Sequence, residues 1–197
     1  MSRIICQNCQ RPVPVCFCHT LEMVNNDWPV HILQHKQEAK HAIGTAIIAQ
    51  LSLQNCQLLT AGNNLCEQKL AQLISDQQPL LIYPGRDSQP LKEIVGQTAR
   101  PLIFIDSTWR KSKRMLLESP QLQSLPKVVF TPTKSSRYHI RKEPNANARS
   151  TLEAIVTVLS TLEHNPEKYQ PLLKTMDWMI QQQIGHMGVD TFTRNYM

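Results

Sequence analysis

Short apolar runs alternate with stretches of helical periodicity along most of the chain. Apolar runs bounded by polar residues or prolines predict strands, whereas apolar residues that recur on one face of a 3.6-residue period predict helices. Apolar strands separated by helices are typical of an α/β fold in which helices cover both faces of a mostly parallel sheet. The predicted strands span residues 30–33, 56–59, 79–84, 101–105 and 127–130, and the predicted helices span 42–53, 65–74, 109–117 and 150–162, with a last helix that Pro166 and Pro171 open.

Two of these helices carry start signals. Ser150-Thr-Leu-Glu153 has the S-x-x-E form of a capping box, in which the serine and glutamate side chains each pair with a backbone group at the start of a helix. Asn63 or Asn64 is placed to cap the helix 65–74. We expect residues 23–197 to form one α/β domain.

Residues 1–22 show neither period and hold four of the six cysteines. Their spacing is C-x2-C-x6-C-x-C, which suits a loop folded tightly around a tetrahedral Zn²⁺. The alternative is four free or disulfide-bonded thiols, and the cytosolic setting expected below disfavours disulfides. Four thiolates leave no open coordination position, so we expect a structural zinc segment at 1–22. Its ligands would be Cys6, Cys9, Cys16 and Cys18, whereas Cys56 and Cys66 lie in apolar segments and are expected to be buried.

The composition excludes several classes of protein. With 197 residues, 41% of them hydrophobic, the chain can bury a core, and it has no apolar run long enough to span a membrane. Its start lacks the apolar region of a signal peptide, so we expect a cytoplasmic protein. None of its six glycines forms a dinucleotide-binding or P-loop motif. An ordinary dinucleotide fold, a P-loop protein and a class I methyltransferase therefore have no support.

The net charge of +6 is unevenly distributed. Between Arg110 and Arg149 there are ten lysines and arginines against two glutamates. Such a field attracts a polyanion, although a solvated basic helix face is the simpler alternative. Trp109, Tyr138 and His139 lie among the cations and have rings that can stack on an unpaired base. We expect a nucleic-acid substrate to bind this half.

Asp106-Ser-Thr-Trp109 directly follows the predicted strand 101–105 and precedes a helix. Ligands of open α/β sheets bind at the carboxyl ends of strands, so Asp106 is a candidate residue of a ligand site. Two alternatives stand: Asp106 or Thr108 caps the helix, and Trp109 is buried in the core. His35, Glu38 and His41 form H-x-x-E-x-x-H. On a helix the outer pair would be about 240° apart and would not face one metal ion, so a metal site here would need the three ligands to come from a loop.

Several segments together resemble the DTW-domain family, the tRNA-uridine aminocarboxypropyltransferases. Asp106-Ser-Thr-Trp109 matches the Asp-x-Thr-Trp signature. One departure is Ala42-Ile-Gly-Thr45, where some members carry Asn-Thr-Gly-Arg. The other segments that resemble family motifs are the cysteine segment with Arg11-Pro12, His35-Lys-Gln-Glu38 with Gly44-Thr45, Tyr138-x-Ile140-Arg141-Lys142-x-Pro144, and Ser150-Thr-Leu-Glu153-Ala154.

The resemblance implies a SPOUT-like knotted sheet that binds S-adenosylmethionine in a bent form. It implies transfer of the 3-amino-3-carboxypropyl group to N3 of a tRNA uridine, with release of methylthioadenosine. Asp106 would accept the N3 proton or hold the ammonium of the methionine tail. The cofactor would contact Tyr83, Pro84, Gly85, Asp106, Thr108, Trp109, Thr131, Ser150 and Thr151, and the tRNA would contact His35, Glu38, Arg110, Lys111, Arg114, Tyr138, Arg141 and Lys142.

Three other functions stay open at this point. One is an S-adenosylmethionine-dependent RNA methyltransferase on the same fold, and another is aminocarboxypropyl transfer to ribosomal RNA. The third is a zinc-stabilised RNA-binding module without activity. We expect no association with a membrane, and a monomer and a homodimer both fit the length of the chain.

Overall fold

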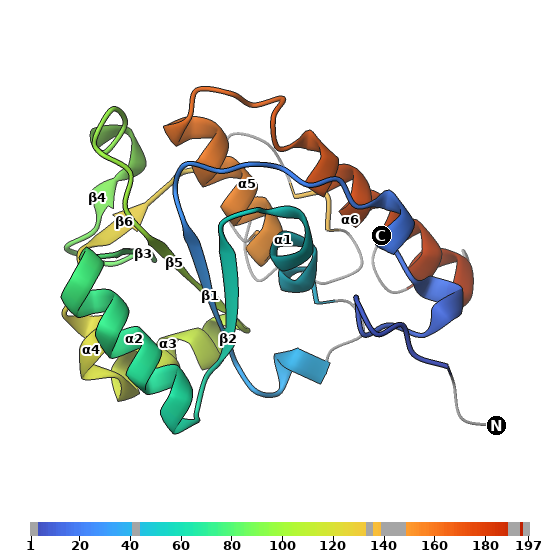
Figure 1. Cartoon of the computed structure of the whole chain (residues 1–197), viewed down its shortest axis with the longest axis horizontal. Coiled ribbons are helices and arrows are strands. Elements are labelled where there is room, and N and C mark those ends of the chain that lie inside the picture. The colour runs from blue at the N-terminus through green and yellow to red at the C-terminus, as the bar shows by residue number, and fades with distance from the viewer. Residues whose placement is uncertain (1–3, 41–43, 133–135, 139–148, 189–193, 195–197) are drawn as a thin grey trace.

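Six strands form one parallel sheet in the order β2-β1-β5-β3-β6-β4 (Figure 1). The computed structural model describes residues 4–40, 44–132, 136–138, 149–188 and 194. Each strand pairs with its neighbours in parallel, which confirms the predicted α/β class and sheet. The strands are β1 Val30–Gln34, β2 Cys56–Thr60, β3 Leu80–Ile82, β4 Gln89–Pro90, β5 Leu102–Asp106 and β6 Lys127–Val129.

Helices cover both faces of this sheet, as predicted. In Figure 1, α1, α5 and α6 lie on one side of the strands, and α2, α3 and α4 lie on the other. Short 3₁₀ turns occur at Val13–Val15, Cys18–Thr20, Glu38–Lys40 and Leu91–Glu93. The helices are α1 Ala46–Ser52, α2 Asn64–Gln77, α3 Trp109–Glu118, α4 Pro120–Gln123, α5 Thr151–Leu162 and α6 Gln170–Met187.

The strand β5 shows why the apolar runs are continuous. Leu102 and Phe104 belong to the core cluster under α1, α5 and α6, whereas Ile103 belongs to the cluster under α2 and α4. Successive side chains of a strand point to opposite faces, so a sheet covered on both faces needs an apolar residue at every position. Leu80 and Leu81 of β3 divide in the same way.

The helix starts match their sequence signals with two differences. The capping box is confirmed: the Glu153 N–H donates to Ser150 Oγ at 3.3 Å, and the Ser150 N–H donates to Glu153 Oε2 at 2.9 Å. Asn63 caps α2 by accepting from the Cys66 N–H at 2.7 Å. The helix predicted from residue 42 begins at Ala46, and residues 42 and 43 lie outside the described residues. The last helix begins at Gln170. Pro171 therefore lies in its first turn, whereas Pro166 precedes the helix.

The amino-terminal segment packs onto α6 and shares its core. Phe17 is fully buried in the same cluster as the residues of α5 and α6. Thr175 Oγ1 donates to the Thr20 carbonyl at 2.8 Å, and the His19 ring meets Trp178 edge-on with centroids 4.7 Å apart. The segment thus gains its few apolar contacts from the larger domain. The predicted boundary at residue 22 stays a prediction.

Candidate active site

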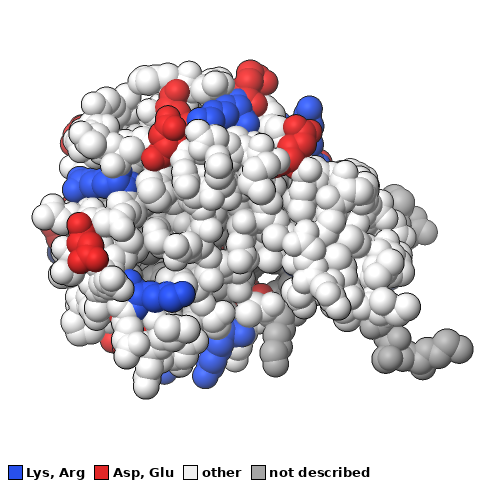
Figure 2. Space-filling model, in the orientation of Figure 1, with Lys and Arg blue, Asp and Glu red and all other residues white. Residues whose placement is uncertain are grey.

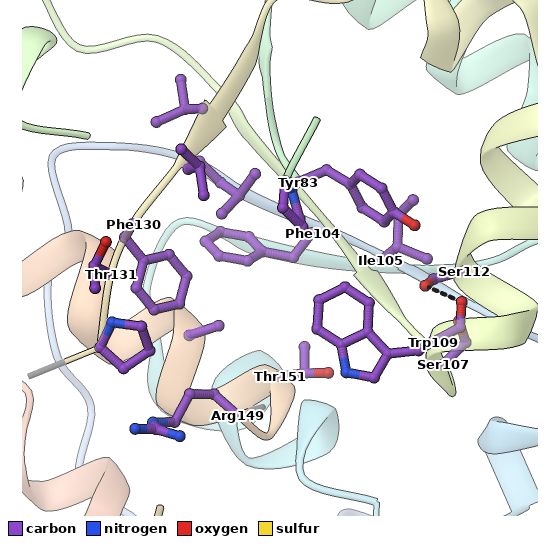
Figure 3. A pocket seen from close by; sticks show the side chains of 16 residues that line it. Tyr83, Phe104, Ile105, Ser107, Trp109, Ser112, Phe130, Thr131, Arg149 and Thr151 are labelled. Atoms are coloured by element: carbon purple, nitrogen blue, oxygen red, sulfur yellow. Dashed lines mark hydrogen bonds between the residues drawn. The ribbon is translucent and has the colours of Figure 1, made fainter. Parts of the chain in front are cut away.

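A cavity of about 460 Å³ opens at the carboxyl ends of β3, β5 and β6, beside the start of α5 (Figure 3). Parallel strands present their carboxyl ends at one edge of the sheet, where ligands bind in open α/β folds. The volume lies within the usual range of small-molecule pockets, about 300–1,000 Å³. The cavity brings together five of the residues expected to hold the cofactor, namely Tyr83, Pro84, Trp109, Thr131 and Thr151.

Aromatic side chains form much of the cavity wall. Figure 3 shows the Trp109 indole and the Phe130 ring on opposite sides of the hollow, with Phe104 between them. The ring of Tyr83 is tilted toward Trp109, with centroids 6.2 Å apart. Trp109 is 43% exposed, so the alternative that it is buried in the core is wrong. These flat apolar surfaces suit a planar heterocycle such as a purine.

Asp106 ends β5 and lies beneath the wall of this cavity. The residue is 9% exposed, and its carboxylate accepts two hydrogen bonds from side chains. Gln34 Nε2 donates to Oδ2 at 2.8 Å, and Thr151 Oγ1 donates to Oδ1 at 2.5 Å. Thr151 lines the cavity, whereas Asp106 is not among the lining residues. The structure therefore places a hydroxyl between the expected catalytic carboxylate and the space where a ligand fits.

The helix-cap alternative for this turn is not supported. Thr108 occupies the cap position of α3 in an extended conformation, but its side chain accepts no capping hydrogen bond. Both oxygens of Asp106 point instead to Gln34 and Thr151. The polar end of β5 is thus directed to β1 and α5, away from its own helix.

Besides Asp106, three expected cofactor residues lie outside the cavity lining. Gly85 forms a turn with Ser88, whose Oγ accepts from the Gly85 N–H at 3.0 Å. Ser150 serves the capping box of α5. Thr108 is half-buried in the loop before α3. These residues position the loops around the cavity and do not line it.

The residues expected to contact RNA divide into several groups. Lys111 Nζ and Glu38 Oε1 form an ion pair at 2.8 Å, and Arg114 pairs with Glu118 at 2.6 Å across one turn of α3. Arg110 is exposed on the same helix, and His35 is half-buried, with its Nδ1 accepting from the Gln37 N–H at 3.2 Å. Arg141 and Lys142 lie outside the described residues.

Tyr138 differs from its sequence-based expectation. It is 6% exposed and belongs to the larger core cluster, so its ring is not presented to a base. The reason is local: Glu153 at the start of α5 accepts from Ser136 Oγ at 3.0 Å and from the Arg137 N–H at 2.7 Å, which holds the preceding residues against the helix. The pattern showed an aromatic residue among cations but could not show this anchor.

The basic half is also less uniform than its sequence suggested. Arg137 pairs with Asp177 at 2.9 Å, and the two cations Lys111 and Arg114 are paired as described above. Figure 2 shows Lys and Arg interspersed with Asp and Glu among the described residues of the visible face. The expected excess of positive charge is thus partly neutralised, by Glu38 and Asp177, which are distant in sequence, and by Glu118 on the same helix as Arg114.

The four amino-terminal cysteines meet in one cluster. Their Sγ atoms all lie within 4.8 Å of one another, with Cys6–Cys18 and Cys9–Cys16 each at 3.7 Å. Four sulfurs bound tetrahedrally at about 2.3 Å lie about 3.8 Å apart, so the cluster fits a metal ion. A disulfide needs about 2.05 Å, and the four thiols are free. Among the described residues this is the one group of three or more possible ligands that converges.

The thiols of the cluster have different environments. The backbone N–H groups of Cys9 and Asn8 lower the pKa of the Cys6 thiol to about 6. Burial raises the pKa of the Cys18 thiol to about 12, although Asn8 Nδ2 donates to its sulfur at 3.4 Å. Backbone donors directed at sulfur are suited to a metal-bound thiolate. Arg11 joins this segment to the rest of the domain by donating from Nη2 to the Gly44 carbonyl at 2.9 Å.

Sequence reasoning missed several residues of the site. Gln34 ends β1 but lies outside the predicted strand 30–33, although a polar residue that ends a buried strand is a usable signal for this edge of the sheet. Phe104 and Phe130 were read only as strand residues. Arg149 was counted with the basic run, yet of the described residues that line the cavity it alone is charged. The sequence pattern does not show which of these side chains point toward the cavity.

Comparison with known proteins gives a consistent result. The DTW domain model matches residues 3–184. The chain is 34% identical to a Drosophila melanogaster protein named tRNA-uridine aminocarboxypropyltransferase 2, over 98% of this chain and 80% of that protein. It is 30% identical to a mouse protein of the same name, over 98% of this chain and 67% of the relative.

A plant relative extends the comparison. The chain is 24% identical to tRNA-uridine aminocarboxypropyltransferase A of Arabidopsis thaliana, over 94% of this chain and 83% of that protein. No solved structure gives a significant match. None of the described helices combines the length and apolar character needed to cross a membrane. Because the DTW model covers nearly the whole chain and two relatives reach 30% identity, the chain belongs to the DTW-domain family.

Proposed function

We propose that this protein is a tRNA-uridine aminocarboxypropyltransferase. It would transfer the 3-amino-3-carboxypropyl group of S-adenosylmethionine to N3 of a tRNA uridine and release methylthioadenosine. The observation that carries this proposal is the aromatic cavity above Asp106, in a chain 34% identical over 98% of its length to a relative with that name. The DTW signature itself forms one side of the cavity through Trp109.

The described residues fit the parts of S-adenosylmethionine. Tyr83, Phe104, Trp109 and Phe130 offer apolar ring surfaces for the adenine. Arg149 would take the carboxylate of the methionine tail, because a guanidinium matches a carboxylate in charge and shape. The buried carboxylate of Asp106 supplies the opposite charge for the ammonium. A zwitterionic tail would therefore lie between Arg149 and the start of α5.

Orientation decides the product of this reaction. S-adenosylmethionine supplies a sulfonium whose substituents include a methyl group and the methionine side chain. Uridine N3 would attack the side-chain carbon next to sulfur, the carbon–sulfur bond would break with its electrons going to sulfur, and the N3 proton would pass to solvent water. The protein must hold the tail so that this carbon, and not the methyl group, faces N3. A tail fixed at both charged ends meets that need.

The fold supports a SPOUT-like arrangement of the cofactor loops. The start of α5, which follows β6 in sequence, lies beside the end of β5, where Thr151 donates a hydrogen bond to Asp106. The cavity is built from several strand ends and needs no glycine-rich loop. We include a knot near the carboxyl end in the proposal, since such a fold binds S-adenosylmethionine without a glycine motif.

The cysteine cluster is proposed to hold one structural Zn²⁺. Four thiolate ligands close the coordination sphere, so the ion would stabilise the fold and take no part in transfer. Arg11 and Phe17 connect the segment to the domain.

For the tRNA, the exposed cations of α3 adjoin the cavity wall. Arg110 and Lys113 are exposed and follow Trp109, which lines the cavity. We propose that they contact phosphates, together with Arg141 and Lys142. The proposal includes a cytoplasmic enzyme, either monomeric or homodimeric, with no membrane partner.

Mass mapping of tRNA from cells that lack the protein tests the reaction and its target together. We expect one aminocarboxypropyluridine to disappear and to return when the wild-type gene is restored. Restoration with Asp106→Asn should leave it absent. Loss of a methylated nucleoside would indicate a methyltransferase. Loss of an aminocarboxypropyluridine from ribosomal RNA would identify ribosomal RNA as the substrate in place of tRNA. Unchanged RNA, with a protein that fails to bind S-adenosylmethionine, would indicate a binding module.

A further inference from the structure

Thr151 lies between Asp106 and the cavity. Its Oγ1 is 2.5 Å from Asp106 Oδ1, and its side chain lines the cavity in which Figure 3 shows it near Trp109. Asp106 is 9% exposed and is not among the lining residues. A ligand in the cavity therefore meets the hydroxyl before it meets the carboxylate.

The hydrogen-bond chemistry fixes the direction of this contact. A carboxylate only accepts, so the single hydroxyl proton of Thr151 is directed to Asp106. The lone pairs of Thr151 Oγ1 then remain for a donor in the cavity. Gln34 Nε2 holds the other oxygen of Asp106 at 2.8 Å, which keeps the carboxylate turned to Thr151.

The arrangement has a clear ligand preference. A hydroxyl that donates inward to an anion is a strong acceptor outward, because hydrogen bonds in a chain polarise one another. An ammonium has three donors and no acceptor, and it gains further from the negative charge behind the hydroxyl. A neutral group gains only the hydrogen bond.

We propose that Thr151 Oγ1 accepts a hydrogen bond from the ammonium of the methionine tail and that Asp106 acts through it as a positioning residue. This inference rests on the proposed function and deepens it. Asp106 orients the hydroxyl and supplies the charge, and Gln34 orients Asp106. No proton leaves the ammonium, so the contact serves orientation. The direct contact between Asp106 and the tail expected from the sequence is replaced by a contact through Thr151.

The test compares binding of S-adenosylmethionine with binding of its analogue that lacks the α-amino group, by titration calorimetry. Wild type should prefer the complete molecule by on the order of 10- to 100-fold. Thr151→Val should lose most of this preference, and Asp106→Asn should lose it as well. The double variant should lose no more than the larger single loss, since the two residues form one contact.

Matched variants separate the contact from folding. Thr151→Ser keeps the hydroxyl and should keep the preference. Thr161→Val makes the same change as Thr151→Val at an exposed position of α5 and should leave the preference intact. If Thr151→Val unfolds, Thr151→Ala takes its place, because it also removes the hydroxyl and must lose the preference that Thr151→Ser retains.

Two results overturn the inference. Thr151→Val that keeps the full preference while Asp106→Asn loses it would show direct contact by Asp106. Retention in both variants would place the ammonium elsewhere. In either case wild type still binds S-adenosylmethionine and forms methylthioadenosine, so only the inference fails. Wild type that binds neither compound overturns the proposed function and this inference together.

Discussion

Gln34 and Asp106 face each other as register partners in the β1–β5 pair, and Gln34 Nε2 donates to Asp106 Oδ2 at 2.8 Å. The backbone adds a second link, because the His35 N–H donates to the Asp106 carbonyl at 3.0 Å. A polar pair at the end of two otherwise apolar strands would cost stability if either partner were unpaired. Because the pair lies under the cavity, we attribute it to a role in the site and not to stability of the sheet.

The first prediction concerns this pair. Gln34→Leu leaves Asp106 Oδ2 without its side-chain donor, so we expect a loss of about 1–3 kcal/mol in the free energy of unfolding, measured by urea titration. Binding of S-adenosylmethionine should weaken in the same variant. Gln57→Leu places the same change at an exposed position of β2 and should alter neither property. Equal behaviour of the two variants would rule out the proposed role of Gln34.

The cysteine cluster gives the second prediction. We expect about one Zn²⁺ per chain by atomic emission, and loss of the ion in Cys9→Ser and Cys18→Ser. Cys56→Ser should retain the metal, because Cys56 lies in β2 and does not belong to the cluster. Chelation should lower the melting temperature, since the loop that positions Phe17 loses its ion. Metal retained by both cluster variants would be inconsistent with this site.

Trp109 should report directly on the cavity. It lines the cavity and is 43% exposed, so Trp109→Ala should weaken S-adenosylmethionine binding roughly 3- to 10-fold with little effect on stability. Wild-type tryptophan fluorescence should change on binding, and Trp109→Phe should remove most of that change. Trp178→Phe should keep it, because Trp178 lies on α6 and packs against His19 of the amino-terminal segment. A signal that survives in Trp109→Phe but is lost in Trp178→Phe would place the ligand elsewhere.

Glu163 at the end of α5 makes stability depend on acid pH. Burial acts to raise the pKa of Glu163, but hydrogen bonds from Lys168 and Tyr169 outweigh it and lower the pKa below its ordinary value of 4.5. A lowered folded-state pKa means that the stabilisation is complete above pH 4.5 and is lost as pH falls through the folded value.

The measurement is the difference in free energy of unfolding between wild type and Glu163→Gln. We expect it to be constant from neutral pH to 4.5 and to shrink at lower pH. Glu167→Gln changes an exposed glutamate nearby and serves as the control. A difference that grows on acidification would contradict the assigned sign.

Local patterns predict the longer elements well and miss elements that are too short to show a period. The capping box at Ser150 and the apolar run of β5 depend on neighbouring residues, so both were readable. β4 was missed because it is only Gln89–Pro90, too short to show a period.

The candidate site was predictable in its location but not in its contacts. Asp106 was placed at a strand end correctly, yet its partners Gln34 and Thr151 are 72 and 45 residues away in sequence. The burial of Tyr138 likewise depends on Glu153, whose capping role alone was visible. Which side chain separates a carboxylate from a cavity is a property of packing, and periodicity carries no information on it.

The central claim is tested most directly by the products formed when purified protein, S-adenosylmethionine and unmodified tRNA are incubated together. Mass spectrometry would follow both the nucleosides of the tRNA and the small molecule released. We predict methylthioadenosine in equal amount to a uridine carrying the aminocarboxypropyl group at N3, and neither product with Asp106→Asn. S-adenosylhomocysteine with a methylated nucleoside, or no product from a protein that retains its metal, would contradict the account.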